Sequence, residues 1–206
     1  LVWGLIELYE AVFEVRYLEA ALELSGFMIA HFRDDAAGGF FFSTERHEDL
    51  FVRKKELVDG ALPSGNSVAA LNLTRLGRLT GNHAWEEHAR CIGRAFGSQV
   101  ARAPWIFTQY LCALDFQLGP TQEIIVVGRT GKPDTEDMLR AARTTFSPHK
   151  TLAFIPSETG DHPLKAIAPH TAAMTSMRGA ATAYVCSGFT CLEPFTDPAG
   201  LMEILR

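Results

Sequence analysis

Hydrophobic side chains recur every three or four residues through the first half of the chain, with polar residues between them. This period is typical of amphipathic helices that bury one face. The pattern predicts helices over residues 2–14, 16–32, from Pro63 to Gly81, 83–101, and from Pro104 to Gly119. The connection between the first two is very short, so we expect them to form an antiparallel hairpin.

The segment between the second and third predicted helices has a different pattern. Residues 34–39 read as a turn, and Phe40–Ser43 and Leu50–Arg53 are short runs that flank a polar tip at Glu45–Asp49. Two short runs separated by a polar tip predict a β-hairpin.

The period changes again after Gly119-Pro120, where short β-branched runs alternate with helical patterns. Strands are predicted over Glu123–Val127, Thr151–Ile155 and Thr182–Val185, and helices from Asp134 to Phe146, over 163–178, and from Asp197 onward. Strand–helix repeats of this kind predict a small parallel α/β unit. We therefore expect two domains, 1–120 and 121–206.

Composition narrows the class of protein. Hydrophobic residues make up 47 % of the 206 residues and the net charge is −5, so we expect a globular protein without nucleic acid or an anionic membrane as partner. No apolar run approaches the roughly 18 residues that a membrane span needs. The chain has no signal-peptide pattern and no initiator Met, so we expect a cytoplasmic protein and a fragment of a longer one.

Several motifs resemble one family. The run Lys55–Ala70 leads from a Gly- and Pro-containing loop into a helix, and it is joined by Gly38–Phe41, Cys112–Phe116 and Ala183–Cys186 in the expected order. The chain resembles the spermatogenesis-associated protein 20-like (DUF255) family of thioredoxin-domain-containing proteins. That resemblance implies a thioredoxin-like domain elsewhere in the parent chain, followed by an (α/α) toroid of the six-hairpin glycosidase type. The first half holds too few helices to close such a ring, so we expect a mainly α fold, a partial toroid of antiparallel hairpins followed by the small α/β unit.

The resemblance places a candidate site in the loop 53–66, since toroidal sugar enzymes bind substrate in a funnel lined by such loops. Glu56 and Asp59 are the candidate catalytic carboxylates, because paired carboxylates perform acid–base chemistry on glycosidic bonds. The candidate substrate-binding residues are Phe40, Phe41, Ser64 and Asn66. The family usually carries an acidic residue just after Gly-Gly-Phe-Phe, and this chain has Phe42 and Ser43 there.

A second interpretation of the same loop is structural. Asp and Asn side chains readily hydrogen-bond to turn backbone and cap helices, and Asp59 and Asn66 stand beside a helix start. Two functions are therefore open: binding or processing of a carbohydrate or other small molecule, and a non-catalytic scaffold that positions the thioredoxin-like domain or a protein partner. We expect no cofactor.

Four cysteines are too few for a disulfide framework. Cys91 and Cys112 lie in apolar helical patterns and are expected in the core. Cys186 and Cys191 lack the spacing of a redox C-x-x-C motif and have no second pair to complete a zinc site, so no metal is expected. Structural thiols, a disulfide or a reactive redox pair all stay open for them.

Overall fold

The computed structural model describes residues 1–44, 52–188 and 190–205. The chain divides into two compact units. The first comprises residues 1–77 and 82–118, and the second comprises residues 78–81 and 119–206.

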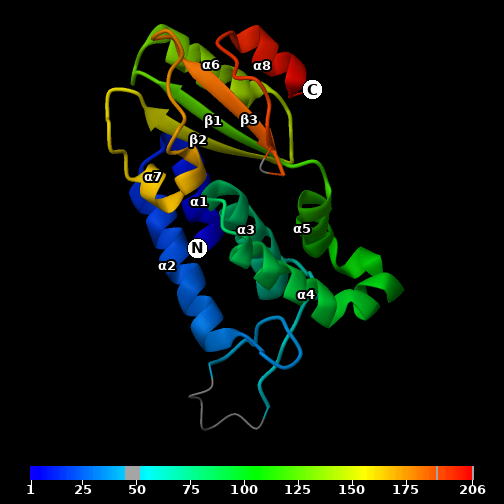
Figure 1. Ribbon diagram of the computed structural model, residues 1–206. Coiled ribbons are helices and arrows are strands. Elements are labelled where there is room, and N and C mark those ends of the chain that lie inside the picture. The colour runs from blue at the N-terminus through cyan, green and yellow to red at the C-terminus, as the bar shows by residue number, and fades with distance from the viewer. Residues whose placement is uncertain (45–51, 189, 206) are drawn as a thin grey trace. The chain divides into compact units, whose positions relative to one another are not determined.

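Helices form the first unit, and their bounds follow the hydrophobic period closely (Figure 1). Its elements are α1 (Val2–Val12), α2 (Val15–Phe32), α3 (Gly65–Thr80), α4 (His83–Arg102), the short 3-10 helix η1 (Pro104–Ile106) and α5 (Thr108–Leu118). Helix α1 ends where Phe13 takes a left-handed conformation with φ of 58°. Helix α2 starts two residues later and packs against α1.

A hydrophobic core joins α3, α4 and α5 to the loop that precedes α3. Ile92 of α4 and Leu73 of α3 are fully buried in it, and Leu57 of the loop and Phe40 of the preceding segment are buried in the same core. Burial of each such side chain contributes about 1.5–3 kcal/mol to folding. The loop 52–64 is thus attached to the helices by its apolar residues, which fixes the position of its polar ones.

The second unit contains a four-stranded sheet with the order β2-β1-β3-β4. Its strands are β1 (Gln122–Gly128), β2 (Lys150–Pro156), β3 (Thr182–Ser187) and β4 (Thr190–Cys191), and its helices are α6 (Pro133–Thr144), α7 (Leu164–Ile167), the 3-10 helix η2 (Pro169–Thr171) and α8 (Pro198–Ile204). Helix α6 packs on β1 and β3, and α8 packs against α6 on the same side of the sheet (Figure 1).

Strands β1 and β2 run parallel and are joined through α6, as the strand–helix repeat predicts. The prediction of an all-parallel sheet is wrong, because β3 and β4 both pair in the antiparallel sense. The local pattern could not show this, since strand direction is decided by which strands pair. The predicted helix 163–178 is also wrong, and only α7 and η2 form there.

The prediction of a mainly α partial toroid is contradicted. The described residues form α1 to α8 together with a four-stranded mixed sheet, which makes an α/β mixture. The predicted β-hairpin is not seen in its described part, where Phe40 makes only an isolated bridge to Arg33. Its predicted tip Glu45–Asp49, with Leu50 and Phe51, lies outside the described residues.

Within the described ranges, every helix is either too short or too polar to cross a lipid bilayer.

Candidate functional site

A cleft of about 560 Å³ opens in the first unit between the end of α2, the segment 40–42 and the loop before α3. It is lined by Met28, Phe32, Phe40, Phe41, Phe42, Glu56, Val58, Gly60, Leu62, Pro63, Ser64, Gly65 and Asn66. Most of the candidate residues from the sequence therefore lie around one cavity. Asp59 is the exception, since it is absent from the lining.

Asn66 lies in the first turn of α3 and ties two walls of the cleft together. Its Oδ1 accepts a hydrogen bond from the Phe40 N–H at 2.7 Å, and its Nδ2 donates to the Phe40 and Glu56 carbonyl oxygens, each at 2.9 Å. The side chain is only 4 % exposed. Because these three bonds engage both ends of the amide, Asn66 positions the walls and has little capacity left to bind a ligand.

Ser64 stabilises the start of α3. Its Oγ accepts a hydrogen bond from the Ser67 N–H at 3.0 Å and donates to Ser67 Oγ at 2.9 Å. Ser67 Oγ in turn donates to the Leu57 carbonyl at 3.3 Å. Ser64 is thus an N-cap, which satisfies one of the free N–H groups at the start of the helix.

Asp59 is turned toward the protein backbone. Its Oδ1 accepts a hydrogen bond from the Ser64 N–H at 2.8 Å. Its Oδ2 accepts from the N–H groups of Gln109 at 2.9 Å and Tyr110 at 3.1 Å, in the first turn of α5. A carboxylate at a helix N-terminus is stabilised by these donors and by the helix dipole. This geometry matches the structural interpretation of Asp59.

Glu56 is the one carboxylate among the described residues that line the cleft. Its side chain is about half exposed and lies 3.3 Å from Lys54 Nζ. Hydrolysis by the two-carboxylate mechanism needs an acid and a base or nucleophile on either side of the scissile bond. The described lining offers Glu56 alone for such a role.

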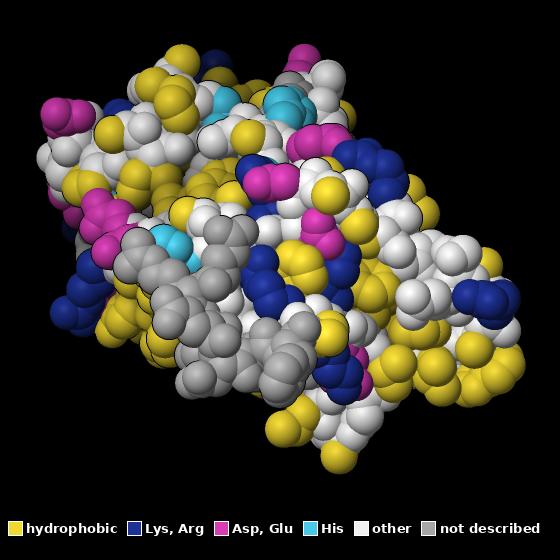
Figure 2. Space-filling view, turned by 90° about the horizontal axis from the view of Figure 1, so that it is seen from below, with side chains coloured by type: hydrophobic (Ala, Val, Ile, Leu, Met, Phe, Trp, Pro, Cys, Tyr) yellow, Lys and Arg dark blue, Asp and Glu magenta, His cyan; other side chains and the backbone are white. Residues whose placement is uncertain are grey.

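Phe40, Phe41 and Phe42 form an aromatic wall of the cleft. Two cationic side chains, Arg53 and Lys55, lie beside this wall. Arg53 Cζ lies 4.0 Å and Lys55 Nζ 5.3 Å from the centre of the Phe41 ring, which places both cations in cation–π contact. Hydrophobic side chains also lie beside Lys and Arg side chains on the face shown in Figure 2. At Phe41, apolar and cationic side chains therefore lie together.

Lys55 also stabilises the turn at residues 34–39, which precedes the aromatic wall. Its Nζ lies 2.6 Å from Asp34 Oδ2 and donates to the Gly38 carbonyl at 2.9 Å. Together with the N–H groups of Ala37 and Ala36, Lys55 lowers the pKa of Asp34 to about 2. Gly38 itself has φ of 77°, and a Cβ there would lie 2.6 Å from the Cys91 carbonyl oxygen, so the turn requires glycine.

The lowered pKa of Asp34 predicts an acid-sensitive turn. Because folding favours the carboxylate, its stabilising effect is complete above the ordinary pKa of 3.8 and is lost as the pH falls toward about 2. Asp34→Asn should therefore lower the urea midpoint at about pH 6 and have little effect at about pH 2. Asp35→Asn is the matched control, because Asp35 is an exposed partner of Arg33 and such pairs contribute little. Equal effects of Asp34→Asn at both pH values would contradict this account.

Phe42 and Leu62 also line the cleft, and they are 85 % and 82 % exposed. The run Phe40-Phe41-Phe42 already indicated Phe42 as part of an aromatic wall, but the sequence pattern did not indicate Leu62. A large apolar residue in a polar, glycine-rich loop is the signal that could have identified Leu62, since it has no helical face to explain it.

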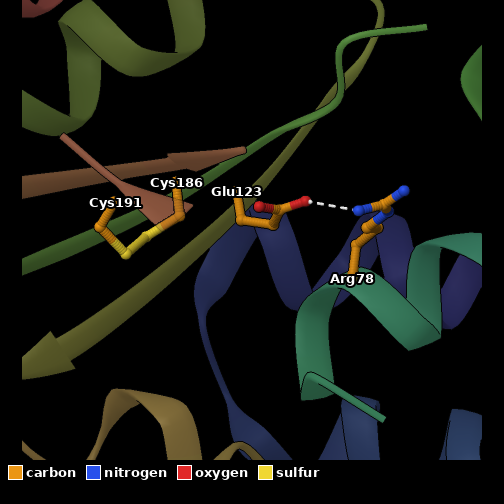
Figure 3. The surroundings of a disulfide bond; sticks show 4 residues. All are labelled: Arg78, Glu123, Cys186 and Cys191. Atoms are coloured by element: carbon orange, nitrogen blue, oxygen red, sulfur yellow. Dashed lines mark hydrogen bonds and ion pairs between the residues drawn. A yellow bond between two sulfur atoms is a disulfide. The ribbon is translucent and has the colours of Figure 1, made fainter. Parts of the chain in front are cut away.

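Cys186 and Cys191 form a disulfide across β3 and β4 in the second unit (Figure 3). The structure therefore contains the bonded form of the two cysteines and not two separate thiols. Cys91 and Cys112 are free; Cys91 is half-buried and Cys112 is exposed, so the expectation that both lie in the core is wrong. Among the described residues no group of His, Cys, Asp and Glu is arranged to hold a metal ion.

No protein-family model matches the chain. Over 204 residues it is 34 % identical to spermatogenesis-associated protein 20 of Homo sapiens and to that of Rattus norvegicus, and 32 % identical to that of Mus musculus. Each match covers 98 % of this chain and 26 % of the relative, so the chain spans about a quarter of the length of these proteins. It is therefore similar to one part of spermatogenesis-associated protein 20.

Proposed function

We propose that the first unit is a non-catalytic binding unit, and that its cleft receives apolar side chains of a protein partner. One observation carries the proposal: the polar side chains around the cleft are committed to the protein's own backbone. Asn66 bonds to Phe40 and Glu56, and Ser64 caps α3. What stays available to an occupant is mainly apolar surface and the Glu56 carboxylate.

The size and exposure of the lining support this role. A volume of about 560 Å³ falls within the range of about 300–1,000 Å³ that is usual for ligand pockets. Phe42 and Leu62 are largely exposed beside it, and covering each would contribute about 1.5–3 kcal/mol to binding. Apolar anchors around a hydrophobic cleft are a common means of recognising a peptide segment.

A carbohydrate is the second candidate occupant. The phenylalanine wall and Glu56 favour it, because sugar rings stack on aromatic faces and their hydroxyl groups bond to carboxylates. The engaged amide of Asn66 counts against it, since a sugar site needs several free polar groups. Glu56 acting alone would support sugar binding rather than two-carboxylate hydrolysis.

Phe42→Ser and Leu62→Ser should each weaken binding of a peptide at least about tenfold, because each removes an apolar anchor worth about 1.5–3 kcal/mol. The measurement is fluorescence anisotropy of labelled short peptides with two Leu or Phe residues, beside calorimetric titration with glucose and N-acetylglucosamine oligomers. Phe146→Ser is the matched control, because Phe146 is 88 % exposed and lies in the second unit.

The outcome separates the two candidates. Peptide binding that is lost in Phe42→Ser and kept in Phe146→Ser supports the protein-binding proposal. Binding of a sugar that Glu56→Gln abolishes, with no binding of any peptide, would overturn it in favour of the second candidate.

A further inference from the structure

The disulfide lies at the open edge of the sheet. Strand β4 is the outermost strand in the order β2-β1-β3-β4, and it contains two residues. Cys186 and Cys191 face each other directly in the antiparallel register of β3 and β4. The bond therefore joins the terminal strand to the rest of the sheet.

Backbone hydrogen bonds hold the same segment without help from the disulfide. Leu192 N–H donates to the Val185 carbonyl at 2.9 Å, and Phe195 and Ala183 exchange two hydrogen bonds of 2.9 and 2.8 Å. The two cysteines are only five positions apart in sequence. A bond that closes so short a loop restricts the unfolded chain less than a long-range one. The fold thus depends little on this bond, which can open without loss of the sheet.

The two sulfur-bearing residues differ in access. Cys186 is 3 % exposed, whereas Cys191 is exposed on β4. Disulfide exchange requires a thiolate to approach one sulfur in line with the bond, so access decides which sulfur is attacked. Cys191 is therefore the more accessible of the two residues.

A buried ion pair lies beside the disulfide. Glu123 of β1 is the cross-strand neighbour of Cys186, and its carboxylate is directed away from the sulfurs toward Arg78, at 3.3 Å (Figure 3). The guanidinium therefore offsets the carboxylate charge on the strand next to Cys186. When the disulfide opens, the Cys186 thiolate therefore lies near a carboxylate whose charge is offset by Arg78. The pairing reduces the repulsion between the two negative charges.

We propose that Cys186 and Cys191 form a thiol–disulfide exchange site whose reaction partner is a dithiol. A thiolate of the dithiol attacks Cys191 Sγ, the Cys191–Cys186 bond breaks, and Cys186 leaves as a thiolate that takes a proton from water. The second thiol of the partner then deprotonates and displaces Cys191 from the mixed disulfide. The partner is oxidised to its disulfide, and the pair is reduced to two thiols by two electrons and two protons.

The test uses the full 206-residue chain with Cys91→Ser and Cys112→Ser, so that no other thiol takes part. The protein is treated with dithiothreitol in native buffer and in urea, quenched with acid and alkylated, and the modified residues are identified by mass spectrometry. For an exposed bond, reduction in native buffer is expected to be at most about tenfold slower than in urea. In a parallel reaction with glutathione, the adduct is expected on Cys191 and the alkyl group on Cys186.

Each other result overturns the proposal. Reduction only in urea would make the bond purely structural. A glutathione adduct on Cys186 would reverse the assigned direction of attack. Two free thiols in the air-oxidised protein would remove the site altogether. None of these results bears on the cleft of the first unit, which contains neither cysteine.

Discussion

Asp59→Ala is expected to lower the free energy of unfolding by about 2–4 kcal/mol, since hydrogen bonds to a charged group contribute about 1.5–3 kcal/mol. The substitution removes the acceptor of three backbone N–H groups, those of Ser64, Gln109 and Tyr110. Two of these donors belong to the first turn of α5, so the start of that helix should fray. Urea denaturation followed by circular dichroism measures the change.

Glu56→Ala is the matched control, because Glu56 is a carboxylate of the same loop and its side chain pairs with the exposed Lys54. Its effect should stay within about 0.5 kcal/mol, as for most surface substitutions. The structural role of Asp59 would be refuted if Asp59→Ala left stability unchanged and abolished binding of a ligand in the cleft.

Asn66→Ala is the second substitution with a large expected effect, a loss of about 2–4 kcal/mol. It leaves a buried N–H and C=O of Phe40 and the C=O of Glu56 without their partner, and each unsatisfied buried group costs about 1–3 kcal/mol. The walls of the cleft should separate, so binding in the cleft should weaken together with stability. Chemical denaturation and the peptide titration measure the two effects on the same variant.

Two further variants sharpen this prediction. Asn66→Asp keeps the acceptor for the Phe40 N–H but replaces both donated hydrogen bonds with repulsion between oxygens, so it should be as damaging as Asn66→Ala. Asn82→Ala removes an exposed cap of α4 and should cost about 0.5–2 kcal/mol. A smaller loss for Asn66→Ala than for Asn82→Ala would contradict the bridging role of Asn66.

The local hydrophobic pattern was sufficient to predict the helices that bury one face. The period of 3.6 residues predicted α2 and α4 nearly to the residue, because their apolar stripes face a core. It failed over 163–178, where Pro169 divides the segment. A residue that precedes proline is disfavoured in the helical conformation, so α7 ends at Ile167 and η2 begins at Pro169.

The local hydrophobic pattern could not predict features that depend on contacts between distant parts of the chain. The antiparallel direction of β3 depends on its pairing with β1, which lies more than fifty residues earlier in the chain. The toroid expected from family resemblance failed for a related reason, since short motifs carry little information about how elements assemble. The four-stranded sheet is what contradicts it.

The sequence was sufficient to predict only part of the candidate site. Phe40, Glu56 and Asn66 do lie around one cleft, because the loop is anchored by its apolar residues. Loop side chains follow no period, so the sequence could not show that Asp59 faces α5 while Glu56, three residues earlier, faces the cleft. The difference between a catalytic pair and a structural acceptor depends on that orientation.

We propose that the cleft binds a peptide through its apolar wall, while Asp59 accepts hydrogen bonds from the backbone of α5. A ¹⁵N–¹H correlation spectrum of the chain, recorded during titration with a binding peptide, tests it most directly. The expected result is that the amide signals of Phe42, Gly60 and Leu62 shift while those of Gln109 and Tyr110 stay in place. Shifts of the Gln109 and Tyr110 amides that match those of the cleft, with Phe42 unaffected, would contradict it.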